Sequence, residues 1–408
     1  MTEPRPTEPG GESRAPGYQR GDSGPAVAEI RAKLSVLGLL DEGDGAELLD
    51  PAGALFDAAT DRAVRAFQQQ RGIVVDGVVG SGTYLALDEA RWRLGDRILV
   101  YVPTRLMAGD DVATLQQRLM GLGFDCGRVD GLFGVESSTA LREFQRNTGL
   151  VPDGTCGPAT LKALDQLSRT VAGGSPHAMR DSEAITRAGP ALAGKLVIID
   201  PGHGSGATGL GSITGPGATG AGPGSLDGGD VVYDVASRLE GRLSAAGASA
   251  FLTRGPDGSA EGPSEEDRAG FANAAAADLV LSLHVNRHDN TQASGFAGFF
   301  YGTDEFGHYS AVGEKLADLV QREVCTRTDL VDCRVHARSW DLLRRTRMPA
   351  VRLELGYLSN PGDAVRLADP AFRDVLAESI AAAVQRLYLP PEDDAETGVL
   401  RIPDWMRV

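Results

Sequence analysis

The sequence predicts an α/β domain, a mostly parallel sheet with helices on both faces, preceded by two small all-α modules of three helices each. Two observations lead to this prediction. In the C-terminal half, short apolar runs alternate with helical stretches, which is the pattern of a parallel sheet covered on both sides. In the N-terminal half, one segment occurs twice at a constant offset, which is typical of a repeated small module. The length of 408 residues allows two to four domains.

Composition and charge limit the classes of function. Hydrophobic residues make up 42% and charged residues 24%, which is ordinary for a globular protein. The formal net charge of −16 repels phosphodiester backbones and anionic lipid, so we expect no nucleic-acid partner. The sequence contains no apolar run of about 18 residues, and we therefore expect no membrane span.

The N-terminal segment and the cysteines bear on location. Residues 1–19 are rich in Pro, Gly and Glu and are expected to be disordered. They lack the apolar run of a secretory signal, which predicts a cytoplasmic protein. The four cysteines fall into two local pairs, Cys126 with Cys156 and Cys325 with Cys333. The pairs could form disulfides in an exported protein or stay reduced, and the missing signal favours reduced thiols.

The repeat predicts three short helices in each copy. Apolar residues at helical spacing define the first helix, and a second helix carries an aromatic anchor. An Asp–Gly pair then forms a tight turn before a third helix, which a threonine is expected to open. In the two copies, AVRAFQQQRGIVVDGVVGSGTYLAL and ALREFQRNTGLVPDGTCGPATLKAL, these features are Phe67 and Phe144, residues 76–77 and 153–154, and Thr83 and Thr160.

The repeated pattern resembles the peptidoglycan-binding type 1 domain, a three-helix module that binds cell-wall peptides. The resemblance covers residues 20–91 and 107–167. It implies peptidoglycan or muropeptide precursors as binding partners. Most of the matching residues are core and turn residues, so the pattern indicates the fold more strongly than the ligand.

A polar linker at residues 168–194 separates the modules from the α/β domain, which we place at residues 195–390 before an acidic tail at 391–408. Four apolar runs read as buried strands, and four longer stretches between them read as helices. The expected strands are Leu196–Asp200, Ala248–Thr253, Leu279–His284 and Ala350–Glu354, and the expected helices are Asp230–Ala246, Ser264–Ala277, Ser310–Cys325 and Ala371–Leu387.

Three titratable side chains stand where expected strands end. His203 follows the first strand, His284 closes the third, and Glu354 closes the fourth. The carboxyl ends of parallel strands share one edge, where ligands bind in open α/β sheets. Two imidazoles and a carboxylate are also a plausible ligand set for catalytic zinc. A single histidine at a strand end is more often a hydrogen-bonded structural residue, but three such residues together indicate a site.

The runs that carry these residues resemble the zinc-dependent N-acetylmuramoyl-L-alanine amidases of the amidase 3 class. The runs are LVIIDPGHGSG, AADLVLSLHVN and MPAVRLELGYLSNP. The resemblance implies zinc as cofactor, with His203 and His284 as metal ligands. It implies Glu354 as the catalytic carboxylate, which would take a proton from a zinc-bound water during hydrolysis of the amide between muramic acid and L-alanine.

The sequence departs from that family at the middle zinc ligand. The family has a glutamate there, just before a helix, whereas alignment on residues 230–232 places Gly228 at this position. Asp227 is a doubtful substitute ligand, because aspartate is one methylene shorter than glutamate. Asp230 is another candidate, although we expect it to cap the helix. The sequence therefore predicts a degraded site in which zinc is weak or absent.

The whole arrangement resembles an actinobacterial group with two peptidoglycan-binding modules, an amidase-like domain and no export signal. That resemblance implies a cytoplasmic regulator of peptidoglycan precursor synthesis. Its implied partners are a precursor-synthesis enzyme and the machinery that handles the lipid-linked precursor. The alternative is an active zinc amidase in peptidoglycan turnover, with Asp227 or Asp230 as the third ligand and an export route that the sequence does not reveal.

Overall fold

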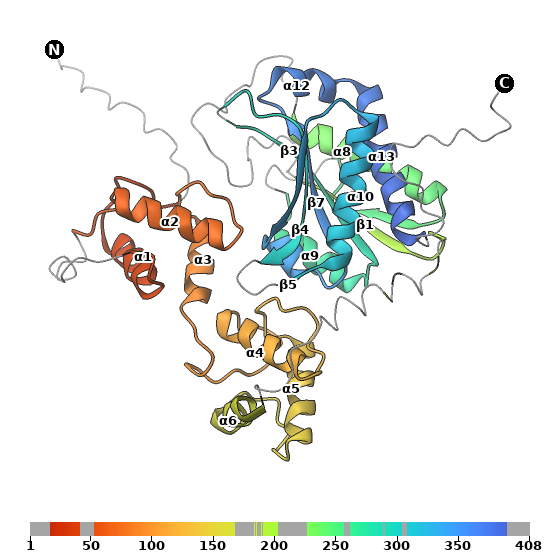
Figure 1. The fold of residues 1–408 in the computed structure, drawn as a ribbon. Helices are drawn as coiled ribbons and strands as arrows, with labels where there is room; N and C mark the ends of the chain where they lie inside the picture. The colour runs from red at the N-terminus through yellow and green to blue at the C-terminus, as the bar shows by residue number, and fades with distance from the viewer. Residues whose placement is uncertain are drawn as a thin grey trace, which may run out of the picture. The chain divides into compact units, whose positions relative to one another are not determined.

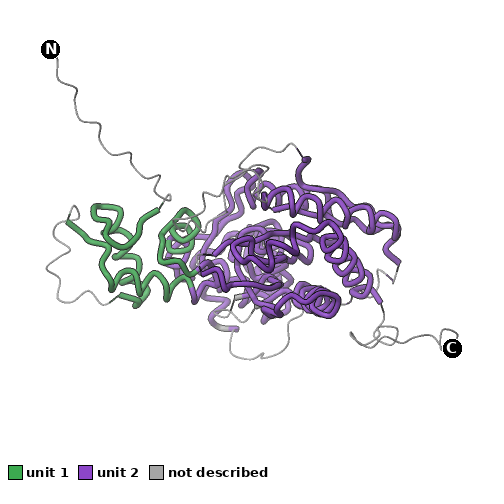
Figure 2. Tube along the Cα trace, turned by 90° about the horizontal axis from the view of Figure 1, so that it is seen from above, with its two compact units in different colours: residues 1–68, 75–87 green, residues 69–74, 88–408 purple. Residues whose placement is uncertain are grey.

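The structure is a computed structural model that describes residues 17–40, 53–167, 183, 185, 189, 191–202, 227–256, 262–288, 290–303 and 308–389. His203, the glycine-rich stretch after it, the N-terminal segment, most of the linker and the acidic tail lie outside the described residues. The chain divides into two compact units (Figure 2). Unit 1 comprises residues 1–68 and 75–87, and unit 2 comprises residues 69–74 and 88–408.

Each copy of the repeat contains the three predicted helices (Figure 1). We call the two copies module 1 and module 2. Their aromatic anchors, Phe67 and Phe144, are both fully buried, and Phe144 packs edge to face against Phe124 with ring centroids 5.6 Å apart. Module 1 consists of α1 (Pro25–Val36), α2 (Ala58–Gln70) and α3 (Ser81–Ala90), and module 2 of α4 (Asp110–Gly121), α5 (Val135–Asn147) and α6 (Pro158–Leu167).

The α/β domain is built on a seven-stranded mixed sheet in the order β2-β1-β3-β7-β4-β5, with β6 paired to β4. The four strands expected from the sequence are parallel neighbours, which confirms the mostly parallel sheet. The sequence did not predict β4, which runs antiparallel to β7, or the two strands beside it. The strands are β1 (Leu196–Pro201), β2 (Ser249–Leu252), β3 (Leu279–Asn286), β4 (Phe296–Thr303), β5 (His308–Tyr309), β6 (Asp332–Arg338) and β7 (Ala350–Tyr357).

Helices cover both faces of this sheet, and the hydrophobic cluster buried on one face is larger than that on the other. On one face, α8 (Gly228–Ala245), α10 (Ala311–Arg327) and α13 (Pro370–Tyr388) bury a large aliphatic core against alternate residues of β1, β3 and β7 (Figure 1). On the other face, α9 (Glu265–Ala274) and α11 (Asp341–Arg345) bury a smaller cluster. The short helix α12 (Pro361–Ala368) follows β7. Because side chains alternate along a strand, every second residue of β1, β3 and β7 faces the smaller cluster.

Local capping fixes where the helices begin. Ser264 and Asp267 form a capping box at the start of α9, and Ser310 caps α10 through the amide of Gly313. Asn360 and Asp369 cap α12 and α13, each directly before a proline whose fixed φ suits the first helical position. These caps fix the first residues of α9, α10, α12 and α13.

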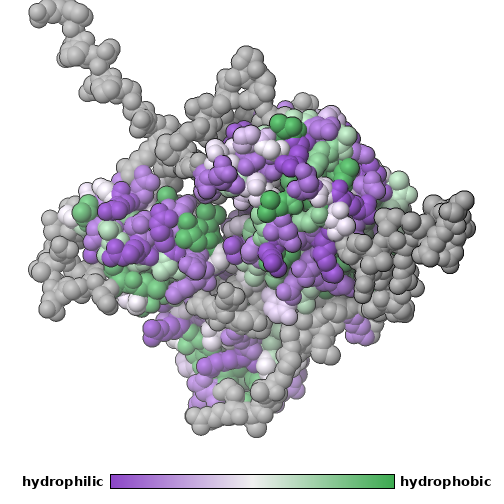
Figure 3. Space-filling view, turned by 45° about the horizontal axis from the view of Figure 1, so that its top comes forward, coloured by the Kyte–Doolittle hydropathy of each residue, from purple (hydrophilic) through white to green (hydrophobic). Residues whose placement is uncertain are grey.

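Hydrophilic side chains predominate on the face drawn in Figure 3, and hydrophobic ones lie among them in small groups. Within the described ranges, no helix combines the length and apolar character that crossing a bilayer requires. The four cysteines are free thiols. Burial raises the pKa of Cys126 and of Cys156 to about 12, so both stay protonated at neutral pH.

Candidate functional site

The structure brings His284 and Glu354 together at the carboxyl ends of two neighbouring strands. The two residues are direct partners across the parallel pair β3–β7, and the register shifts between His284 and Asn286. Both side chains belong to the face that α9 and α11 cover, and the residues are only 5% and 4% exposed. An imidazole and a carboxylate are therefore held side by side in a nearly water-free part of the rim.

Gly202 closes one side of this pair. Its amide donates to the carbonyl of Leu283 at 2.8 Å, which holds the chain after β1 against β3. A Cβ atom at Gly202 would lie 2.3 Å from Cε1 of His284, a distance that no side chain tolerates. Only glycine allows the backbone to approach the imidazole this closely. His203, the next residue in the sequence, lies outside the described residues.

A buried carboxylate orients the His284 ring through Ser282. Asp200, at the end of β1, is fully buried and accepts hydrogen bonds from Thr253 and Ser282 at 2.6 Å each. Arg268 from α9 pairs with the same carboxylate at 3.2 Å. The Ser282 hydroxyl lies 3.0 Å from Nε2 of His284.

This chain of contacts determines the tautomer of His284. The carboxylate of Asp200 pairs with Arg268, and the Ser282 hydroxyl donates its proton to it. The Ser282 oxygen then accepts from Nε2–H of His284. Sequence reasoning missed Asp200 and Ser282. The available signal was that each is a polar residue inside an otherwise apolar strand.

Arg352 engages the carboxylate of Glu354. Its Nε and a terminal nitrogen donate to the same oxygen, Oε1, at 3.0 and 2.9 Å. Arg352 also pairs with Glu265 of α9 at 3.3 Å and lies 4.4 Å from the ring centroid of Trp340. The expected proton acceptor is therefore part of an ion pair with a stacked guanidinium.

Asp227 caps α8 in this structure. Its carboxylate accepts from the amide of Gly229 at 2.7 Å. Our expectation that Asp230 caps this helix was wrong, because the helix begins at Gly228 and Asp230 lies in its first turn. A Cβ atom at Gly228 would lie 2.8 Å from Cγ2 of Val285, so the helix start packs too closely on β3 for a larger residue in this conformation.

The residues present do not complete a zinc site within the described part of the chain. A tetrahedral site needs three protein ligands and an open position. His284 offers one nitrogen, Gly228 has no side chain, and the carboxylate of Asp227 is engaged at the helix start. Among the described side chains, no three His, Cys, Asp or Glu residues converge on a point that could hold a metal ion.

Arg254 joins the end of β1 to the start of α8. This buried side chain donates to the carbonyl of Pro201 at 2.9 Å and to that of Gly229 at 3.0 Å. Burial lowers the pKa of its guanidinium, which the carboxylate of Asp200 partly offsets. The end of β1 and the start of α8 are thus held together by one residue.

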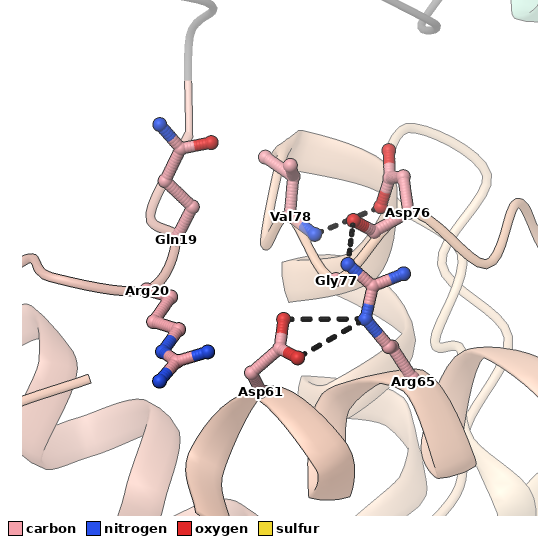
Figure 4. Close-up of a pocket in the computed structure, with 7 residues that line it drawn as sticks. All are labelled: Gln19, Arg20, Asp61, Arg65, Asp76, Gly77 and Val78. Carbon is pink, nitrogen blue, oxygen red and sulfur yellow. Dashed lines mark hydrogen bonds and ion pairs between the residues drawn. The ribbon is translucent and has the colours of Figure 1, made fainter. Parts of the chain in front are cut away.

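In module 1, a polar pocket of about 240 Å³ lies over the turn at Asp76 (Figure 4). Arg65 donates to the carbonyl of Asp76 at 2.8 Å and pairs with Asp61 at 3.1 Å. The side chain of Arg20 extends toward Asp61 from the opposite wall (Figure 4). The pocket thus offers both guanidinium and carboxylate groups to a ligand.

Three Asp–Gly turns in the modules share one construction. A buried glutamine donates from Nε2 to the turn aspartate and to a hydroxyl in the following helix, and its Oε1 accepts from the glycine amide. All nine contacts lie between 2.8 and 3.2 Å. The sets are Gln68 with Asp76, Gly77 and Thr83; Gln116 with Asp130, Gly131 and Ser137; and Gln145 with Asp153, Gly154 and Thr160.

The expectation that Thr83 and Thr160 open the third helices was wrong by a few residues. The helices begin at Ser81 and Pro158, and the threonines lie inside the first turn. Each threonine hydroxyl instead accepts a hydrogen bond from the buried glutamine. The middle turn, at Asp130, was not recognised from the sequence.

An α/β fold with an imidazole and a carboxylate at the carboxyl rim of its strands, joined to repeated helical modules, defines a class of multidomain proteins built on an enzyme scaffold. The chain belongs to the N-acetylmuramoyl-L-alanine amidase family. Residues 197–386 match the family's model, and residues 23–87 and 108–164 match that of a putative peptidoglycan binding domain.

The relative that shows the family is CwlM, and two further proteins are similar to part of this chain. The chain is 50% identical over 380 residues to N-acetylmuramoyl-L-alanine amidase CwlM of Mycobacterium tuberculosis, over 93% of this chain and 91% of that protein. It is 29% identical over 216 residues to the germination-specific N-acetylmuramoyl-L-alanine amidase of Bacillus subtilis, over 50% of this chain and 84% of that protein. Among solved structures, the amidase AmiC2 of Nostoc punctiforme is 27% identical, with a TM-score of 0.40 over 47% of this chain and 96% of that one.

Proposed function

We propose that this chain is a peptidoglycan-binding regulator of precursor synthesis, built on an amidase fold whose zinc site is degraded. The observation that carries the proposal is the state of the middle ligand position. Gly228 stands there without a donor atom, and the neighbouring carboxylate of Asp227 caps α8. His203 and His284 would remain as two imidazoles, which hold zinc weakly without a third protein ligand.

The packing around Gly228 supports this proposal. A glutamate at this position would place its Cβ 2.8 Å from Val285, a branched side chain that cannot rotate away freely. The helix start has therefore adapted to the small residue. The ion pair between Arg352 and Glu354 also supports it, because the carboxylate expected to act in catalysis is already engaged by a guanidinium.

We place this regulator in the cytoplasm. Four free thiols, two of them deeply buried, support a reducing compartment. The partners in the proposal are muropeptide precursors, a precursor-synthesis enzyme and the machinery that handles the lipid-linked precursor. The proposed layout is module 1 at residues 20–91, module 2 at 107–167 and the amidase-like domain at 195–390.

The pocket of module 1 is the contact that we propose for the cell-wall ligand. A peptide stem carries both amino and carboxylate groups, and the pocket presents Arg20 and Arg65 together with Asp61. Charge-assisted hydrogen bonds to both kinds of group would orient such a ligand.

Zinc content and amidase turnover of the purified full-length protein test the proposal. We expect zinc well below one equivalent after dialysis, no cleavage of muramoyl-peptides, and retained binding of soluble muropeptides. The variant Glu354→Ala is the matched control and should behave like the wild type in all three assays. One equivalent of zinc, together with cleavage that Glu354→Ala abolishes, would contradict the proposal.

A second candidate function is a working zinc amidase. The observation that favours it is that His284 and Glu354 lie on adjacent strands as direct register partners. In that case Asp227 would have to leave the α8 cap to serve as a ligand, or Asp230 would have to serve instead. The same assays distinguish the two candidates, because only the amidase requires stoichiometric metal.

A further inference from the structure

An arginine covers each of the three Asp–Gly turns. In module 1, a Cβ atom at Gly77 would lie 2.6 Å from a terminal nitrogen of Arg65. In module 2, a Cβ atom at Gly154 would lie 2.8 Å from Nε of Arg142. These two arginines come from the same module as the turn that they cover.

The third turn, Asp130–Gly131 of module 2, takes its arginine from the α/β domain. A Cβ atom at Gly131 would lie 3.2 Å from a terminal nitrogen of Arg344 in α11. Arg344 donates from Nε to the carbonyl of Asp130 at 2.6 Å, just as Arg65 donates to the carbonyl of Asp76. The α/β domain thus completes this turn of the module.

We call the contact between residues 128–131 of module 2 and the α/β domain the seam. Further hydrogen bonds cross it in both directions. Arg128 of module 2 donates to the carbonyls of Thr346 and Met348 at 2.9 and 2.7 Å. These carbonyls follow the end of α11, where helical partners are missing. In the opposite direction, the Tyr301 hydroxyl of β4 donates to the carbonyl of Val129 at 2.8 Å.

The charges at this seam are buried and paired. The Arg344 side chain is only 14% exposed and pairs at 2.8 Å with Glu89, in the last turn of α3, which belongs to unit 2. Although burial alone would lower it, the pKa of Arg344 is raised, chiefly by the carboxylate of Glu89. Burial raises the pKa of Asp130 and of Tyr301. Removing one partner while the contact stays closed would leave the other charge buried and unpaired, which is unfavourable.

The seam lies at the edge of the sheet opposite the candidate site. Met348 precedes β7, and Tyr301 follows Phe300, which pairs with Val351 at the amino end of β7. His284 and Glu354 lie at the carboxyl ends of β3 and β7. A contact here therefore leaves the rim uncovered.

We infer that module 2 is a docked, structural part of the α/β domain, and that its Asp130–Gly131 turn is an interaction surface occupied by α11. Module 2 and the α/β domain fold and open as one unit. Module 2 thus keeps a turn at Asp153 that is equivalent to the Asp76 turn of module 1 and is covered from within the module, and it uses its other turn of the same construction for docking. This inference does not depend on the proposed function.

Hydrogen–deuterium exchange of the full-length protein tests this assignment. In Arg344→Ala, the amides of residues 125–134 should exchange at least about tenfold faster than in the wild type, because a buried bond and ion pair are lost. The matched control is Arg142→Ala, which removes the arginine over the other turn of module 2 and should leave residues 125–134 within about twofold of the wild type. Equal exchange in Arg344→Ala and the wild type would overturn the inference.

The wild type alone gives a second measurement, which holds even if Arg344→Ala fails to fold. If module 2 and the α/β domain are one cooperative unit, the slowest amides of α5 and of α13 open with the same free energy and the same dependence on denaturant. Slowest amides in α5 that open at clearly lower denaturant than those of α13 would overturn the inference.

Discussion

Gly202 decides where the imidazole of His284 lies. The glycine backbone fills the space beside the ring, and its amide donates a hydrogen bond to the carbonyl of Leu283 that holds the chain after β1 against β3. On the other side, Ser282 and Asp200 fix the ring through Nε2. The ring is thus held by packing from one direction and by hydrogen bonds from another, which leaves it a single orientation.

Substitution of Gly202 by alanine should destabilise the protein. The added methyl group overlaps the His284 ring, so the free energy of unfolding should fall by about 1–3 kcal/mol, as for other overpacked sites. Gly241→Ala, within α8, is the matched control, because a Cβ there meets no atom within 4 Å and alanine favours a helix by about 1 kcal/mol. Urea unfolding followed by circular dichroism measures both. Equal stabilisation by the two variants would show that the methyl group added at residue 202 does not overlap the His284 ring.

Single residues also show how far sequence reasoning reached. His284 and Glu354 were found because each closes an apolar run. Asp200 and Ser282 were missed because their importance depends on strand order, which places β1 beside β3 and their side chains on one face. The cap at Asp227 was assigned to Asp230 because a glycine pair obscures where the helix begins.

Among the elements, the Asp–Gly turns are the most uniform feature of the modules. Each turn surrounds a glutamine, and the hydrogen bonds of the glutamine amide hold the turn in place. Gln68 and Gln145 sit at equivalent places of the two copies, and both are fully buried. A buried amide with all its bonds made stabilises the turn, but the same groups left unpaired are costly.

Gln145→Ala should lower the free energy of opening measured at α5, within the unit that module 2 forms with the α/β domain, by about 1–3 kcal/mol, because the glycine amide and the Asp153 carboxylate lose a buried partner. Gln68→Ala should have a similar effect in module 1. Gln69→Ala, at an exposed position of the same helix, is the control and should change stability by less than about 0.5 kcal/mol. Hydrogen exchange of α5 and α2 resolves the modules separately. Comparable losses at Gln68 and Gln69 would contradict this account.

At the scale of elements, the sequence predicted the helices of both modules and the four parallel strands, with ends within a few residues. Periodicity was strong there because each element buries one continuous apolar face. It did not predict β4 or β6. In β4, glycines interrupt the run FAGFFYGT, and β6 is only partly buried, so neither shows the signature of a core strand.

Across the whole molecule, burial and charge are distributed unevenly. The deep aliphatic core lies behind the sheet, whereas the face toward α9 and α11 carries a row of charged and polar residues. The docking seam adds further buried ion pairs at the opposite edge of the sheet. Stability should therefore come from the core and the seam, and a metal ion at the rim should contribute little.

The melting temperature should be the same in EDTA and in excess zinc. A ligand at one hundred times its dissociation constant stabilises a protein by about 2.7 kcal/mol, which raises the melting temperature of a domain of this size by about 5–10 °C. Differential scanning fluorimetry of the full chain measures the difference. A rise of that size with zinc that is lost in His284→Ala would indicate a real metal site and would contradict the degraded rim.

Arg254 has a consequence for how this rim can diverge. By joining Pro201 to Gly229 it ties the end of β1 to the start of α8. A variant that loses this side chain therefore loosens both segments at once, and the scaffold cannot diverge at one of them without affecting the other.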